Sequence, residues 1–260
     1  MGYFLVHENG WRGAVDPVKM RKLIAAFSVS FIAFLSAHAQ SFVNLNFESA
    51  NVPASGVQPY GTFVPITSAL PHWTAYLGTQ QITQVGYNSP ANSTASITLI
   101  GPTWNSTDTG TYLGAGIIDG NYSVDLQTGA NPLYPTPETV NASIEQYGTV
   151  PSTAKSLLFD AFESTPLSVT FNGNALSPVA LSSGVLSADG VFYTLYGVNV
   201  SALAGQTGEL EFTADFNGSF NLVVLDDISF SPNAVPEPSI VALTAMGGLL
   251  FGARKWLARR

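Results

Sequence analysis

The chain has 260 residues, contains no cysteine, and has charged side chains at only 10% of its positions. From Gln40 to Ala234 it carries fourteen acidic residues and one basic residue, Lys155, which gives this stretch a net charge of −13. A surface this negative repels phosphate groups, so nucleic acid is excluded as a partner. The absence of cysteine excludes thiol catalysis, thiolate metal sites and redox switching.

The N-terminal region has the three-part layout of a secretory signal peptide. Met20-Arg21-Lys22 is a short basic start, and an apolar run extends from Leu23 to Leu35. Ala37 and Ala39 then place small residues at the −3 and −1 positions of a cleavage site. We expect residues 20–39 to form a signal helix that is removed after Ala39.

Residues 1–19 do not fit this layout. Glu8 and Asp16 lie where the start of a signal peptide should be basic. We therefore interpret residues 1–19 as a misassigned start and Met20 as the true first residue.

Residues 40–232 read as short apolar or alternating runs separated by Gly, Pro, Asn and Ser. Alternation is strictest in two runs, Leu167–Phe171 and Leu210–Phe216, which is typical of strands with one buried face. The other runs are Phe42–Phe47, Trp73–Gly78, Ser96–Ile100, Tyr122–Leu126, Ser156–Phe162, Phe192–Val200 and Leu222–Phe230. This spacing predicts one all-β domain, a two-sheet antiparallel sandwich of the jelly-roll type.

Two local signals refine this expectation. Asn172-Gly173 follows a predicted strand and is typical of a hairpin turn that needs positive φ. Ser201–Ala204 is the one segment of the domain that favours a short helical turn. The loop at 129–138 carries three prolines, but dividing the domain there would leave its sheets without partners, so we expect one domain.

The C-terminal segment 233–260 has a different character. Pro236-Glu237-Pro238 holds the chain extended, and an apolar run then extends from Ile240 to Ala253. As a helix, this run rises about 21 Å, short of the roughly 30 Å of a bilayer core. The final cluster has four basic residues, Arg254, Lys255, Arg259 and Arg260, which favour the cytoplasmic side. We therefore expect a marginal single transmembrane helix.

This tail resembles the PEP-CTERM sorting signal of Gram-negative bacteria that carry an exosortase. The resemblance covers residues 235–260 and rests on the Pro-Glu-Pro triplet, the apolar helix and the terminal basic cluster, in that order. It implies that an exosortase recognises Pro236, Glu237 and Pro238, and that the chain is cleaved there. The protein would then be anchored briefly in the inner membrane and released to the cell surface or extracellular matrix.

A second resemblance concerns the domain itself. Asn44–Glu48 and Leu225–Phe230 are similar to the first and last strands of galactose-binding-like jelly rolls, as found in carbohydrate-binding modules. Such modules often hold a structural calcium ion where these two strands meet. The resemblance implies Glu48 and Asp226 as ligands of Ca²⁺, the one cofactor expected; the alternative is that these side chains are solvated or bound to turn amides.

The residues offer little for catalysis. His72 is the single histidine of the domain, so a multi-histidine zinc site is excluded. The domain also lacks the Gly-x-Ser-x-Gly motif of serine hydrolases. Glu209 and Glu211 share one face of a predicted strand, which leaves a pair of glycosidase carboxylates open. We expect both to face solvent, and we expect no enzyme.

Sugar binding would require exposed aromatic rings. Trp104 lies in a polar run and is expected to be the most exposed aromatic, followed by Tyr134 in the proline-rich loop. The sequence thus favours a non-catalytic surface or matrix protein. The alternatives are a carbohydrate-binding module for exopolysaccharide and, behind it, a glycoside-acting hydrolase.

Overall fold

The computed structural model describes residues 40–52, 62–89, 94–102, 104, 116–133 and 138–235. These residues belong to one compact unit that begins at Gln40. The expected signal peptide, residues 1–19 and the sorting tail from Pro236 onward lie outside the described residues. Within the described ranges, no helix is long and apolar enough to cross a membrane.

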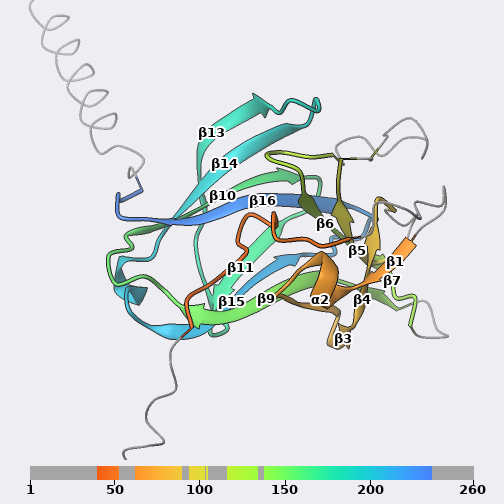
Figure 1. Cartoon of the computed structure of the whole chain (residues 1–260), viewed down its shortest axis with the longest axis horizontal. Helices are drawn as coiled ribbons and strands as arrows, with labels where there is room; N and C mark the ends of the chain where they lie inside the picture. Colours follow the sequence, from red (N-terminus) through yellow and green to blue (C-terminus); the bar gives the residue numbers. More distant parts are fainter. Residues whose placement is uncertain are drawn as a thin grey trace, which may run out of the picture. The chain divides into compact units, whose positions relative to one another are not determined.

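The larger of two main sheets has eight strands (Figure 1). Their order across the sheet is β1 (Thr62–Pro65), β4 (Gln84–Tyr87), β5 (Ser96–Ile100), β6 (Ser123–Gln127), β16 (Leu222–Ser231), β10 (Ser156–Glu163), β14 (Phe192–Asn199) and β13 (Val179–Leu186). Neighbouring strands are antiparallel except for β4 and β5, which run parallel. The sequence analysis expected only antiparallel pairs, whereas this sheet contains one parallel pair.

The smaller main sheet has six strands, all antiparallel to their neighbours. Their order is β12 (Asn174–Ala175), β11 (Leu167–Phe171), β15 (Thr207–Ala214), β9 (Ala142–Thr149), β2 (Thr74–Leu77) and β3 (Gln80–Ile82). A separate two-stranded ribbon joins β7 (Gly129–Ala130) to β8 (Thr139–Val140). The described helical segments are one turn each, α2 (Ile66–Ala69) and η1 (Ser201–Leu203), and η1 confirms the helical turn predicted there.

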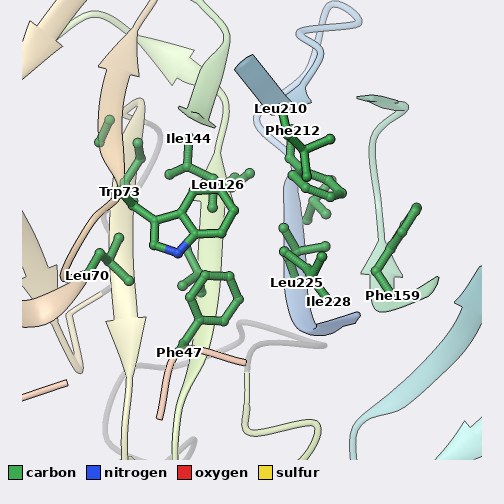
Figure 2. Close-up of a cluster of buried hydrophobic side chains, with 14 of the residues drawn as sticks. Phe47, Leu70, Trp73, Leu126, Ile144, Phe159, Leu210, Phe212, Leu225 and Ile228 are labelled. Carbon is green, nitrogen blue, oxygen red and sulfur yellow. The ribbon is translucent and has the colours of Figure 1, made fainter. Parts of the chain in front are cut away.

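The main hydrophobic core lies between these two sheets, which confirms the predicted β-sandwich. Leu126 and Leu225 come from the larger sheet, and Ile144 and Phe212 come from the smaller one. Figure 2 shows these side chains gathered into one cluster. All four are fully buried, as the alternation of inward and outward residues along a strand requires.

Trp73 stands directly before β2 and belongs to this core, where 4% of its surface is exposed. Its ring lies 5.6 Å from that of Phe47, and its indole nitrogen donates a hydrogen bond of 2.9 Å to the carbonyl of Asn44. Figure 2 shows Trp73 with Phe47 and Leu70 around it. The indole is thus buried with its polar atom satisfied, which makes it an anchor for the segment that precedes β1.

The segment Phe42–Phe47, predicted as the first strand, is instead a series of turns with one isolated bridge at Ser41. Asn44 and Phe47 have φ values of 52° and 60°, far from the negative φ of a regular strand. Phe42 and Phe47 are nevertheless buried. The hydrophobic side chains of this segment therefore enter the core from turns and not from a strand.

A second, smaller hydrophobic cluster covers the opposite face of the eight-stranded sheet. On β16, Val223 and Leu225 belong to the main core, whereas Leu222 and Val224 belong to this outer cluster. Ile100, Ile117, Ile118 and Val191 complete its buried members. Both faces of the sheet are therefore apolar near β16, which explains why the sequence of β16 reads as a nearly continuous hydrophobic run.

Candidate functional site

The site residues predicted from the sequence have different outcomes. Pro236, Glu237, Pro238 and Tyr134 lie outside the described residues. Trp104 is described, but it is half-buried and packs against the outer hydrophobic cluster. The prediction that Trp104 is the most exposed aromatic is therefore wrong. The apolar outer face of the eight-stranded sheet supplies a surface that an indole ring covers.

Glu48 binds the loop that leads into β6. One of its carboxylate oxygens accepts hydrogen bonds from the backbone N–H groups of Asn121 (2.7 Å) and Tyr122 (2.9 Å). The other accepts one from the Asn121 side-chain amide at 3.0 Å. A single carboxylate thereby fixes the start of a strand that lies in the middle of the larger sheet.

Asp226 binds the same loop from β16. Its Oδ2 accepts hydrogen bonds from the Asp119 N–H (3.0 Å) and the Ser123 hydroxyl (2.6 Å), and its Oδ1 accepts one from the Asp227 N–H (2.7 Å). Burial raises the pKa of Asp226 to about 7, although these hydrogen bonds oppose the shift. Glu48 and Asp226 therefore both bind this loop.

The donor set around these two residues does not fit calcium. Calcium requires six to eight oxygen ligands with free lone pairs, whereas N–H and O–H donors already point at the oxygens of both Glu48 and Asp226. Among the described residues, no group of three or more acidic or histidine side chains is placed to hold a metal ion. The geometry matches the alternative reading, in which both carboxylates hold turn amides.

The most exposed aromatic rings lie elsewhere in the sandwich. Phe63 on β1 and Tyr147 on β9 are each 69% exposed. Phe192 on β14 follows, with 61% of its surface exposed. The sequence analysis did not single out Phe63. Its signal was present, because Pro65 two residues later restricts this short strand to a sheet edge, where an outward aromatic meets solvent.

Phe63 borders a hollow of about 410 Å³, which we call the edge groove. Strands β1, β4 and β5 of the larger sheet form one wall, and the β2–β3 hairpin of the smaller sheet forms the other. Pro132 and Leu133 close one side of the edge groove. The edge groove therefore lies where the edges of the two sheets approach each other.

Local structure places the groove's polar groups. Leu77 pairs with Gln80, so Gly78 and Thr79 form a two-residue turn, with φ of 60° at Gly78. This tight turn brings β3 to the sheet edge, where Gln80 and Gln81 are exposed. Gln84, at the start of β4, supplies a third exposed amide. The edge groove is thus lined by one exposed phenyl ring and by three exposed glutamines.

The outer face of the six-stranded sheet carries the carboxylates that the sequence analysis considered for glycosidase chemistry. Glu211 on β15 lies directly opposite Glu145 on β9, and Glu209 lies opposite Tyr147. The Tyr76 hydroxyl donates a hydrogen bond of 2.8 Å to Glu145, and this bond is the main reason that the pKa of Tyr76 rises to about 12. Burial raises the pKa of Glu145, while the bond from Tyr76 opposes the rise.

A shallow hollow of about 460 Å³ adjoins these side chains. Of the described residues that line it, Glu211 is the one carboxylate; the rest are Gly78, Thr79, Thr139, Val140, Asn141, Ser143 and Thr213. A glycosidase needs two carboxyl groups on either side of the bond that it cleaves. The hollow does not bring such a pair together, and Glu209 and Glu211 lie in a row along an open sheet face.

Comparisons with known proteins place no family on the chain. No protein-family model matches it, and no curated protein sequence matches it. One similar solved structure is described as an exo-β-agarase; it has a TM-score of 0.28 and 17% identity, over 75% of this chain and 25% of that chain. Another is the GH31 α-xylosidase from Xanthomonas citri, with a TM-score of 0.21 and 11% identity, over 60% and 13% respectively. The chain spans about a quarter of the first structure and 13% of the second. Neither likeness is high enough to support a function.

Proposed function

We propose that this chain is an exported, non-catalytic protein of the bacterial surface or extracellular matrix, and that its β-sandwich binds polysaccharide through the edge groove. One observation carries the binding proposal. Phe63, whose phenyl ring is 69% exposed, borders a groove that Gln80, Gln81 and Gln84 also line.

This combination suits the chemistry of sugars. A sugar ring has apolar C–H faces, which pack on an aromatic ring, and hydroxyl groups that both donate and accept hydrogen bonds. A glutamine amide offers two donors and an acceptor, so it can satisfy a hydroxyl in either direction. Ligand sites in general combine apolar walls with a few polar groups that fix orientation.

Binding is favoured over catalysis by what the edge groove contains. No carboxylate or histidine is found among the described residues that line it. Glycoside hydrolysis needs an acid together with a base or nucleophile. A groove of amides and hydroxyls can hold a glycan without supplying either group, so we propose no hydrolase activity.

The sequence at the two ends supports an extracellular location. A signal peptide at 20–39 would direct export, and the PEP-CTERM-like tail would hold the chain in the inner membrane until an exosortase acts at Pro236-Glu237-Pro238. The released sandwich would then meet polysaccharide outside the cell. The high acidity of the domain keeps such a protein soluble there.

A glycan array probed with the exported protein tests the binding proposal. We expect the protein to retain at least one polysaccharide class, and Phe63→Ala to weaken that binding about tenfold or more, because one stacked aromatic contributes on the order of 1–3 kcal/mol. The matched control is Phe192→Ala, which removes a phenyl ring of similar exposure from a strand outside the groove. A blank array, or equal binding by both variants, would contradict the proposal.

A further inference from the structure

We infer that the edge groove selects uncharged polysaccharides and rejects acidic ones. This inference rests on the proposed function and narrows it to a class of ligand. It follows from the charge of the groove and of the domain around it. The identity of the sugar-binding residues alone would not determine this selectivity.

The lining of the edge groove is neutral. None of its thirteen described residues has an ionisable side chain. Its hydrogen-bonding side chains are the three glutamines together with Thr83, Thr94 and Ser96. Amides and hydroxyls can pair with sugar hydroxyls, but they provide no full positive charge for a carboxylate or sulfate.

The one basic residue between Gln40 and Ala234 lies at the other end of the larger sheet. Ser96 of the groove pairs with Gln127, which pairs with Leu222 at the start of β16. Lys155 precedes Ser156, which pairs with Ser231 at the end of the same strand. The ten residues from Leu222 to Ser231 span about 30 Å, well beyond a Debye length of about 8 Å at physiological salt.

Binding of an acidic polysaccharide would therefore cost free energy. Its carboxylates would leave water for a groove without a cationic partner, and desolvation of an unpaired charge is costly. The domain's net charge of −13 adds long-range repulsion. A neutral polysaccharide avoids both costs, because the groove can replace each hydroxyl–water hydrogen bond with one to an amide.

The experiment compares polysaccharides that differ only in charge. The exported full-length product is titrated with a soluble neutral glucan, galactan or mannan, and with the polyuronate made from each by oxidation at C6. We expect binding to the neutral polymer to be at least tenfold tighter, and to be unchanged between low and high salt. Equal or tighter binding of the polyuronate would overturn the inference while leaving the proposed function intact. Binding to none of the polymers would overturn both.

Two lysine variants test the location of the selectivity. Gln84→Lys places a cation in the edge groove, and Ser152→Lys places the same charge on an exposed residue beside Lys155. We expect Gln84→Lys to bind the polyuronate at least tenfold better than the wild type does, whereas Ser152→Lys does not. Gln81→Lys replaces Gln84→Lys if the latter does not fold. An equal gain from Ser152→Lys would show that overall charge, and not the groove, decides the selectivity.

Discussion

Asp125 is a carboxylic acid in an apolar setting. It lies on β6 between Val124 and Leu126, which face the main core, so its own side chain faces the outer cluster. The residue is fully buried, and neither carboxylate oxygen has a hydrogen-bond partner among the described residues. This burial raises the pKa of Asp125 to about 8, so the protonated form is favoured at neutral pH.

Because of this raised pKa, the contribution of Asp125 to the free energy of unfolding falls as pH rises. Because the folded pKa lies above the unfolded value of about 4, the native state keeps a proton that the unfolded chain releases. The contribution of Asp125 is therefore fully present below about pH 4 and is lost as pH rises to about 8. We expect Asp125→Asn to remove several kcal/mol of this pH dependence, as measured by urea unfolding at about pH 5 and about pH 9. Glu138→Gln, at an exposed residue, is the control and should leave the slope unchanged.

Glu48 provides a second residue-scale prediction. Glu48→Gln keeps the shape of the side chain but removes the charge that three amide donors face, so we expect the free energy of unfolding to fall by about 1–3 kcal/mol. EDTA should leave the melting temperature of the wild type unchanged, because amides and not calcium satisfy this carboxylate. A lower melting temperature in EDTA, restored by calcium, would show that the metal prediction was right.

The candidate site shows what single residues reveal in a sequence. The resemblance to jelly rolls placed Glu48 and Asp226 where a first and a last strand meet, but Glu48 lies in a turn, and the two carboxylates share a loop instead. Phe63 was not predicted, because an aromatic residue in a short apolar run is usually part of a core. Trp104 was misjudged for the converse reason: polar neighbours in the sequence suggested exposure, but the indole packs on the apolar outer face of the sheet.

At the scale of elements, the hairpin between β11 and β12 confirms the turn predicted at Asn172-Gly173. Both residues have positive φ, 50° and 71°, as a two-residue turn of this kind requires. The Asn172 side chain also accepts a hydrogen bond of 2.9 Å from the Glu209 N–H, which joins the turn to β15.

Substitution at this turn tests whether backbone conformation or contact matters there. A Cβ at Gly173 would meet no described atom within 4 Å, so the cost of Gly173→Ala comes from its positive φ alone. We expect a loss of about 1–2 kcal/mol in the free energy of unfolding. Gly173→Asn should cost less, because asparagine tolerates this conformation. Equal losses for both variants would contradict this explanation.

Strands with strong alternation were predictable from the sequence, and those without it were not. Leu167–Phe171 is observed as β11 with the predicted bounds, and Val169 and Phe171 are buried. The strand β13 was missed, because its serines, glycine and two register shifts obscure any pattern of burial. Short edge strands such as β1 and β3 were missed too, since three or four residues carry too little pattern.

At the scale of the whole molecule, the folded sandwich lies between two segments that the sequence predicts to be sorting signals. The structure describes the chain up to Val235, so both expected cleavage sites remain sequence predictions. We expect the mature protein to begin at Gln40 and to end within or beside Pro236-Glu237-Pro238. The intact mass of the protein recovered from the cell surface or medium measures both ends at once. A mass that retains Ile240–Arg260 would mean that the tail is a permanent anchor.

The overall charge and the edge groove together connect the fold to its proposed role. The acidity of the sandwich suits the proposed extracellular role, and the neutral edge groove is the feature that we propose for polysaccharide binding. The fold alone does not determine this role, because β-sandwiches support many functions. The residues of the groove are therefore what an experiment should address.

The most direct measurement is a crystal structure of the exported protein with an oligosaccharide that the glycan array retains. We predict that a sugar ring lies against Phe63 and that its hydroxyls hydrogen-bond the amides of Gln80, Gln81 or Gln84. A sugar bound on another face, with the edge groove empty, would contradict the account.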